Sequence, residues 1–295
     1  MKLAVTLTQE PSIEALIEAG AEIFILGLDE FSHRMNHTFN LEDLKRIIKI
    51  LKQHHKEVYI NLNRIVHDTH LSLLEGAIEQ IKDFNVEGIL YTDLAVFMFA
   101  EKHGLTSRLI YAPETYTTHS YDLEFWNNEQ IQAVVLAREV TLEDLESIAH
   151  KKLLPIVFFG HGYINMFHSR RPLIENFFKH TKDKDPEEVL DRRDLTIVEE
   201  IRDEHYPIYQ DTYGTHIFRE KPRQSFTVLE RLKEVLDVFV VDSILLKESD
   251  FIEAVADYRL AIDKEVSQSM ISKYKHTHDD GLYFKRTQAI KGEKT

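Results

Sequence analysis

Charged and polar side chains follow several short apolar runs of this 295-residue chain, at the points where the strands of an α/β protein would end. Carboxylates can act as general acids or bases, and an arginine fork can hold a carboxylate through two parallel hydrogen bonds. The candidate catalytic residues are Glu30, Asp93, Glu114, Glu139 and His161. The candidate substrate-binding residues are Arg34, Asn63, Arg64 and Arg138. This set could bind a small carboxylate or a peptide terminus, and the alternative for each member is that it only satisfies a buried charge.

In Gly160-His161-Gly162 a histidine stands between two glycines directly after an apolar run, which suggests a functional histidine. Glycines permit a sharp turn after the apolar run 154–159, and a histidine can transfer protons near neutral pH. The alternative is a turn histidine with a structural hydrogen bond. A second histidine-rich segment, 276–280, lies in the tail without a predicted element to hold it, so we predict no metal site there.

The elements that would position these residues alternate along the chain. Short apolar, β-branched runs are separated by longer amphipathic segments, which is typical of parallel strands joined by helices. The predicted strands are 3–7, 23–27, 58–63, 88–93, 109–112, 133–137, 155–160 and 238–242. Eight such units predict a (β/α)8 TIM-like barrel of the α/β class, in which functional side chains gather where the strands end.

The regular alternation stops between the seventh and eighth predicted strands. Strand-like runs at 195–202, 206–210 and 215–218, with a turn at 211–214, predict a small β-rich insertion over one mouth of the barrel. We therefore divide the chain into a barrel at 1–265, which includes the insertion at about 161–235, and a C-terminal tail at 266–295.

Composition narrows the function. Fifty acidic against 36 basic residues give a net charge of −14, which disfavours direct binding to nucleic acid or to an anionic membrane. The chain has no cysteine, so disulfides and thiolate-held metal or iron–sulfur centres are excluded. The apolar run at the N-terminus is too short for a secretory signal, and we expect a cytoplasmic protein.

Six strand-end segments, taken together and in order, resemble the collagenase-like peptidase family U32. The segment 26–34 resembles the family's E-F-S-x-R, 61–63 its T-L-N and 91–94 its Q-D-L. The segment 136–139 resembles its L-A-R-E, 161–162 its H-G, and 258–262 its Y-R-x-A-I. On these motifs the chain is identified as a member of the family.

Two departures from the family pattern bear on function. Family members that modify RNA carry cysteines four and eleven residues after the histidine of H-G, thought to hold an iron–sulfur cluster; here those positions are Asn165 and Pro172. Neither side chain can replace a thiolate on iron. The family's E-G-R after the eighth strand is replaced by Asp242-Ser243-Ile244.

The resemblance implies two kinds of activity. Some members are described as peptidases without agreed catalytic residues, and others act in prephenate-dependent hydroxylation of the tRNA wobble uridine or of ribosomal RNA. The leading prediction is a role in wobble-uridine hydroxylation, with prephenate as a ligand and a larger, cysteine-containing family member as a partner that contacts the tRNA. The alternatives are a collagenase-like peptidase of unknown mechanism and a non-enzymatic barrel scaffold.

Overall fold

Eight parallel strands close into a barrel in the computed structural model, which describes residues 1–151, 153–182, 185, 188–190, 192–199 and 203–284. The strands are β1 (Lys2–Thr6), β2 (Ile23–Leu28), β4 (Glu57–Leu62), β5 (Gly88–Tyr91), β6 (Leu109–Tyr111), β7 (Ala133–Val135), β8 (Ile156–His161) and β13 (Val238–Val241). Strand β1 pairs with both β2 and β13, which closes the barrel, and the two-residue β3 (Thr38–Phe39) lies beside β2. The predicted (β/α)8 barrel is confirmed.

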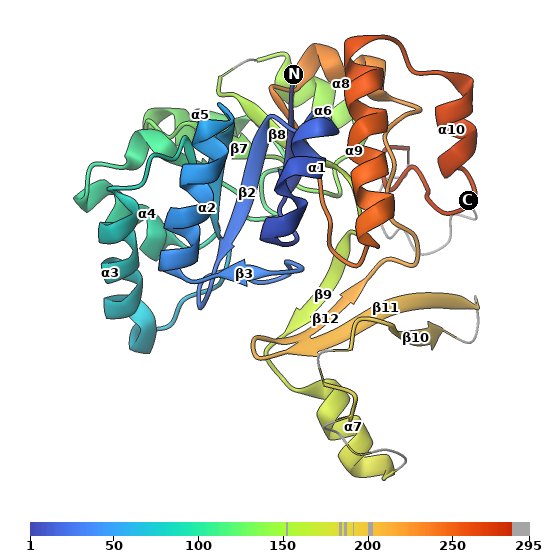
Figure 1. Cartoon of the computed structure of the whole chain (residues 1–295), viewed down its shortest axis with the longest axis horizontal. Coiled ribbons are helices and arrows are strands. Elements are labelled where there is room, and N and C mark those ends of the chain that lie inside the picture. Colours follow the sequence, from blue (N-terminus) through green and yellow to red (C-terminus); the bar gives the residue numbers. More distant parts are fainter. Residues whose placement is uncertain (152, 183–184, 186–187, 191, 200–202, 285–295) are drawn as a thin grey trace.

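Helices cover the outside of the barrel (Figure 1). They are α1 (Ile13–Glu18), α2 (Leu41–Gln53), α3 (Leu71–Ile81), α4 (Leu94–Lys102), α5 (Ser120–Asn128), α6 (Leu142–Ala149), α8 (Leu229–Val235) and α9 (Glu248–Asp263), with short 3-10 turns at Glu10–Ser12, Asp68–His70 and Thr106–Arg108. In α2 the Asn40 side chain accepts a hydrogen bond from the Asp43 amide, and Thr141 caps α6 in the same way. None of the described helices is long and apolar enough to cross a membrane.

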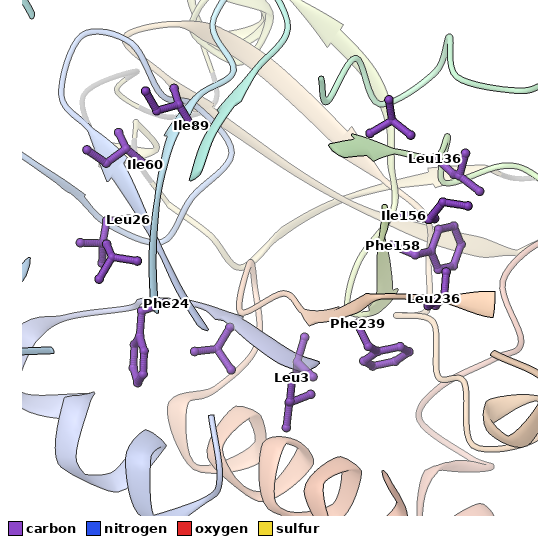
Figure 2. Packing of buried hydrophobic residues seen from close by; sticks show 14 of the residues in the cluster. Leu3, Phe24, Leu26, Ile60, Ile89, Leu136, Ile156, Phe158, Leu236 and Phe239 are labelled. Carbon is purple, nitrogen blue, oxygen red and sulfur yellow. The ribbon is translucent and has the colours of Figure 1, made fainter. Parts of the chain in front are cut away.

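The core has two parts, because successive residues of a strand face opposite sides of the barrel wall. Phe24 and Leu26 pack in the layer between strands and helices, whereas Ile23 and Ile25 fill the barrel interior. Figure 2 shows the outer layer, where Leu3, Phe24 and Phe239 project from the strands toward the helices. Full burial of side chains of this size stabilises the fold by about 1.5–3 kcal/mol each.

The insertion is an antiparallel sheet with one helix, and it extends away from the barrel (Figure 1). It contains β9 (Asn165–Ser169), α7 (Leu173–Thr181), β10 (Leu195–Glu199), β11 (Glu204–Asp211) and β12 (Gly214–Phe218), with the strand order β10-β11-β12-β9. The predicted β-rich unit between the seventh and eighth barrel strands is confirmed. Strand β9 and helix α7 were not predicted, and positions 200–202 of the predicted strand 195–202 lie outside the described residues.

Residues that follow α9 pack back onto the barrel. Helix α10 (Gln268–Tyr274) is followed by a segment that pairs with Arg223 through Asp279. Tyr274 and Tyr283 belong to the same apolar cluster as the barrel strands. The described part of the tail therefore covers the barrel near β8 and β13.

Candidate functional site

A small polar cavity lies at the carboxyl ends of the barrel strands. Its volume is about 30 Å³, room for about one water molecule. The polar residues that line it are Thr6, Arg34, Asn61, Asn63, Glu114, Arg138 and Asp242. Four of the predicted site residues, Arg34, Asn63, Glu114 and Arg138, are thus brought together from four different strand ends.

The first ion pair in the cavity joins Arg34 to Glu114. The Arg34 Nη2 atom donates to Glu114 Oε1 at 2.6 Å. Burial alone would raise the pKa of Glu114, but Arg34 and Arg138 outweigh it and hold that pKa below its usual value. Both residues of the pair have left-handed backbones, with φ of 54° at Arg34 and 66° at Glu114. Such angles are uncommon for residues other than glycine, and they point both side chains inward at a cost in backbone strain.

The second ion pair joins Arg138 to Asp242. Arg138 Nη1 lies 3.2 Å from Asp242 Oδ2 and also donates to the Tyr163 carbonyl, while the guanidinium carbon lies 4.2 Å from the centre of the Phe159 ring. Asp242 also accepts a hydrogen bond from the Thr6 hydroxyl at 3.2 Å. Its pKa is raised by burial, despite the opposing effect of Arg138. The buried Asp242 carboxyl group therefore contacts an arginine, Arg138, that is itself stacked on Phe159.

Asn63 fixes the loop that carries Arg34. Its side-chain oxygen accepts from the His33 amide at 3.0 Å, and its side-chain nitrogen donates to the His33 carbonyl at 3.2 Å. Because both polar atoms of the His33 backbone are bound, the position of the next residue, Arg34, is determined by the end of β4.

Thr6, Asn61 and Asp242 also line the cavity, although they were absent from the predicted site. The signal for Asp242 was present in the sequence, since it follows the apolar run of the eighth predicted strand. Asp93 and Asp242 each follow an apolar strand run, so the same sequence pattern indicates both residues.

Four of the other predicted residues lie outside the cavity lining. Asp93 caps α4 and accepts from the amides of Ala95 at 2.9 Å and Val66 at 2.8 Å. Arg64 lies 3.6 Å from the Glu30 carboxylate, and its guanidinium stacks on the Tyr213 ring at 4.6 Å. Because Tyr213 belongs to the insertion, Arg64 joins the barrel to the insertion. Glu139 is exposed.

His161 lies on the other side of the barrel wall, so its expected place in the mouth is wrong. The register between β8 and β13 shifts at this point, and His161 pairs with Val241, which belongs to the outer apolar layer. The imidazole Nδ1 lies 3.3 Å from the Tyr258 hydroxyl, and the ring packs against Tyr274 and His278. Burial and His278 lower its pKa well below the usual value. His161 is therefore a neutral histidine between the barrel and the tail.

No group of three or more histidine, aspartate or glutamate side chains is arranged to hold a metal ion in the part of the chain that the structure describes.

The fold and this cavity define an α/β-barrel protein with a polar site at the carboxyl ends of its strands. The family model described as peptidase family U32 matches residues 9–289, and the chain belongs to that family. A solved structure of a U32 peptidase superposes with a TM-score of 0.51 over 82% of this chain and 92% of that one, at 11% identity, which supports the fold.

Curated relatives include proteins of tRNA hydroxylation. The chain is 29% identical over 267 residues to tRNA hydroxylation protein P2 of Bacillus subtilis, covering 89% of this chain and 85% of that protein. It is 25% identical to an uncharacterized protease of Methanocaldococcus jannaschii, covering 92% of this chain and 70% of that protein. It is 22% identical to tRNA hydroxylation protein P1 of Bacillus subtilis, covering 56% of this chain and 39% of that protein.

Proposed function

We propose that this chain binds prephenate in the barrel cavity and acts in hydroxylation of the tRNA wobble uridine, as the non-cluster partner of a larger, cysteine-containing family member in the cytoplasm. The similarity to two proteins named for tRNA hydroxylation in one organism supports a role in a pair. The chain has no thiolate for an iron–sulfur cluster, so the partner would supply any cluster chemistry.

The observation that carries the proposal is the presence of two arginines in one cavity, each paired with an internal carboxylate. Prephenate carries two carboxylates, and a guanidinium fork matches a carboxylate through two parallel hydrogen bonds. In the present structure Glu114 and Asp242 take the places at Arg34 and Arg138 that ligand carboxylates would take. Because the cavity holds about one water molecule, prephenate has to displace these internal carboxylates.

A peptidase is the second candidate. It is favoured by the same cavity, because Glu114 and Asp242 both line a space the size of one water molecule. A buried carboxyl whose pKa is raised, as at Asp242, has the property required of a general acid. The similarity to an uncharacterized protease supports this alternative.

The experiment is nucleoside analysis of tRNA from a strain that lacks this gene. We expect the hydroxylated wobble uridine to fall and to return when the wild-type gene is restored. Arg138→Lys should restore it poorly, whereas Arg231→Lys, at an exposed ion pair with Glu146 outside the cavity, should restore it fully. Unchanged hydroxylation in the deletion strain, together with hydrolysis of gelatin peptides by the purified protein, would favour the peptidase. If the deletion strain keeps its hydroxylated uridine and the purified protein hydrolyses no peptide, the non-enzymatic scaffold is the remaining alternative.

A further inference from the structure

Three histidine rings meet where the insertion packs on the barrel. His33 comes from the loop after β2, His168 from β9 and His216 from β12. The ring centres of His33 lie 5.0 Å from His168 and 5.9 Å from His216, and those of His168 and His216 are 4.6 Å apart. His33 is 4% exposed and His216 is fully buried. We call these three residues the histidine cluster.

The polar atoms of the cluster are only partly satisfied. Both ring nitrogens of His33 and the Nδ1 atom of His216 have no hydrogen-bond partner among the described residues. The Nε2 atom of His216 lies 3.3 Å from Asp211 Oδ1, and that of His168 lies 3.3 Å from the Tyr213 carbonyl. Buried polar groups without partners cost free energy, so a role other than stability is expected for them.

The arrangement does not suit a metal ion. A metal bound to an imidazole lies in the plane of the ring, but the rings of His168 and His216 are stacked within 2° of parallel. No single position then lies in both ring planes. This agrees with the absence of a metal-binding group in the described part of the chain.

The cluster is connected to the cavity through the backbone. His33 precedes Arg34, and its backbone is held at both polar atoms by the Asn63 side chain. Arg34 then turns inward with φ of 54° to reach Glu114. A displacement of the His33 backbone would therefore displace Arg34, which is the next residue and one of the two cavity arginines.

The surroundings of the cluster oppose positive charge. Arg34 and Arg64 from the barrel side and Arg193 from the insertion act on its members, and Asp211 is the carboxylate that faces it, beside His216. The uncharged Tyr209 ring lies 4.8 Å from that of His216, and the Tyr213 backbone closes the side of His168. Burial is the largest cause that lowers the pKa of all three histidines, and the nearby arginines add to it. Asp211 acts in the opposite direction and favours a proton on His216, but burial outweighs it, so a proton is disfavoured on each of the three rings.

We infer that the histidine cluster is a positioning device for the cavity, which docks the insertion on the β2 loop and holds Arg34 against Glu114 only while its three rings are uncharged. The importance of Arg34 rests on the proposed function, whereas the docking itself does not.

The direction of the pH effect follows from the equilibrium between docked and undocked insertion. A histidine whose pKa is lowered in the docked state stabilises docking above its ordinary pKa of 6.5. That stabilisation is lost as the pH falls below 6.5, because the undocked state then binds the proton more tightly. For each histidine that stays neutral when docked, the docking equilibrium weakens about tenfold between pH 7.5 and pH 5.5.

Hydrogen exchange measures this equilibrium without a ligand. We expect backbone amides of residues 29–38 and 205–218 to lose protection together between pH 7.5 and pH 5.5, by about tenfold or more after correction for intrinsic exchange rates. His33→Phe keeps an aromatic ring and removes no hydrogen bond of the ring, so the variant should fold. Its loss of protection between pH 7.5 and pH 5.5 should be about tenfold smaller than that of the wild type, because one titrating ring has been removed. His180→Phe, at an exposed position in α7, is the matched control and should behave as the wild type.

Two results would overturn the inference. One is protection in the wild type that does not change with pH, a measurement that needs no variant. The other is loss of protection in the insertion while residues 29–38 stay unchanged, which would separate the cluster from Arg34. Addition of prephenate then tests the proposed function separately: it should raise the protection of residues 29–38, and no effect would reject prephenate as the ligand without altering the pH result.

Discussion

Two arginine–carboxylate pairs give the cavity its chemical character. Arg138 makes three kinds of contact, because it stacks on Phe159 and donates hydrogen bonds to both Asp242 and a backbone carbonyl. Arg34 reaches its partner from a strained backbone. Strain of this kind persists where the surrounding structure enforces it, and it is often found at binding sites.

At the residue scale, Arg138→Lys should weaken prephenate binding. A lysine keeps the positive charge but replaces a planar fork by a point charge, and it loses the stacking on Phe159. Loss of one charged hydrogen bond costs about 1.5–3 kcal/mol, roughly ten- to a hundredfold in affinity. Calorimetric titration of prephenate into both proteins checks this, with Arg231→Lys as the control. Equal affinity in all three proteins would remove Arg138 from the site.

Peptides are the second ligand for the same titration. Binding of short peptides that is weakened by Arg138→Lys, without binding of prephenate, would transfer the carboxylate-binding role to a peptide terminus and support the peptidase.

At the scale of elements, the site depends on how the ends of β7, β8 and the tail are held together. The fully buried Arg223 donates through Nη1 to the Arg138 carbonyl at 2.9 Å and through Nη2 to the Phe159 carbonyl. Its guanidinium lies over the rings of Phe158 and Tyr283. One side chain thus ties the backbone of both members of the Arg138–Phe159 stack to the segment after α10.

Gly160 provides the test of this junction. A Cβ atom at Gly160 would lie 1.9 Å from the ring of Phe239, which is buried against Tyr258 and cannot easily move. We expect Gly160→Ala to lower the free energy of unfolding by about 1–3 kcal/mol through overpacking. Gly76→Ala in α3 meets nothing within 4 Å and should instead stabilise by about 0.5–1 kcal/mol. Urea denaturation measures both, and a neutral effect at Gly160 would contradict the packing described here.

At the scale of the whole molecule, the net charge of −14 disfavours a general electrostatic attraction of this chain to RNA. Three arginines of the insertion contact other side chains of the chain. Arg192 pairs with Asp194, Arg193 stacks on Tyr209, and Arg219 pairs with Asp279. A partner that carries the tRNA is consistent with this distribution.

We therefore expect the isolated chain to bind tRNA only weakly, with a dissociation constant above about 10⁻⁴ M at physiological salt, because it offers few phosphate contacts. A gel-shift titration checks this, with the larger family member and the mixture of both proteins as comparisons. Tight binding by the isolated chain would contradict the assignment of the tRNA to the partner.

The sequence by itself determined the barrel, because hydrophobic periodicity and strand spacing are local properties that each segment carries. It also placed four of the cavity residues, since side chains after parallel strands meet at one end of a barrel. Family membership followed from short motifs at those same strand ends.

The tertiary structure decided which polar side chains share the cavity. Arg138 and Asp242 are 104 residues apart and meet because β7 and β13 both pair with β8 in the barrel. A register shift between β8 and β13 turns His161 outward, and no local pattern in the sequence reports such a shift. The histidine cluster likewise arises from the docking of the insertion, because its members come from three elements that are brought together only by packing.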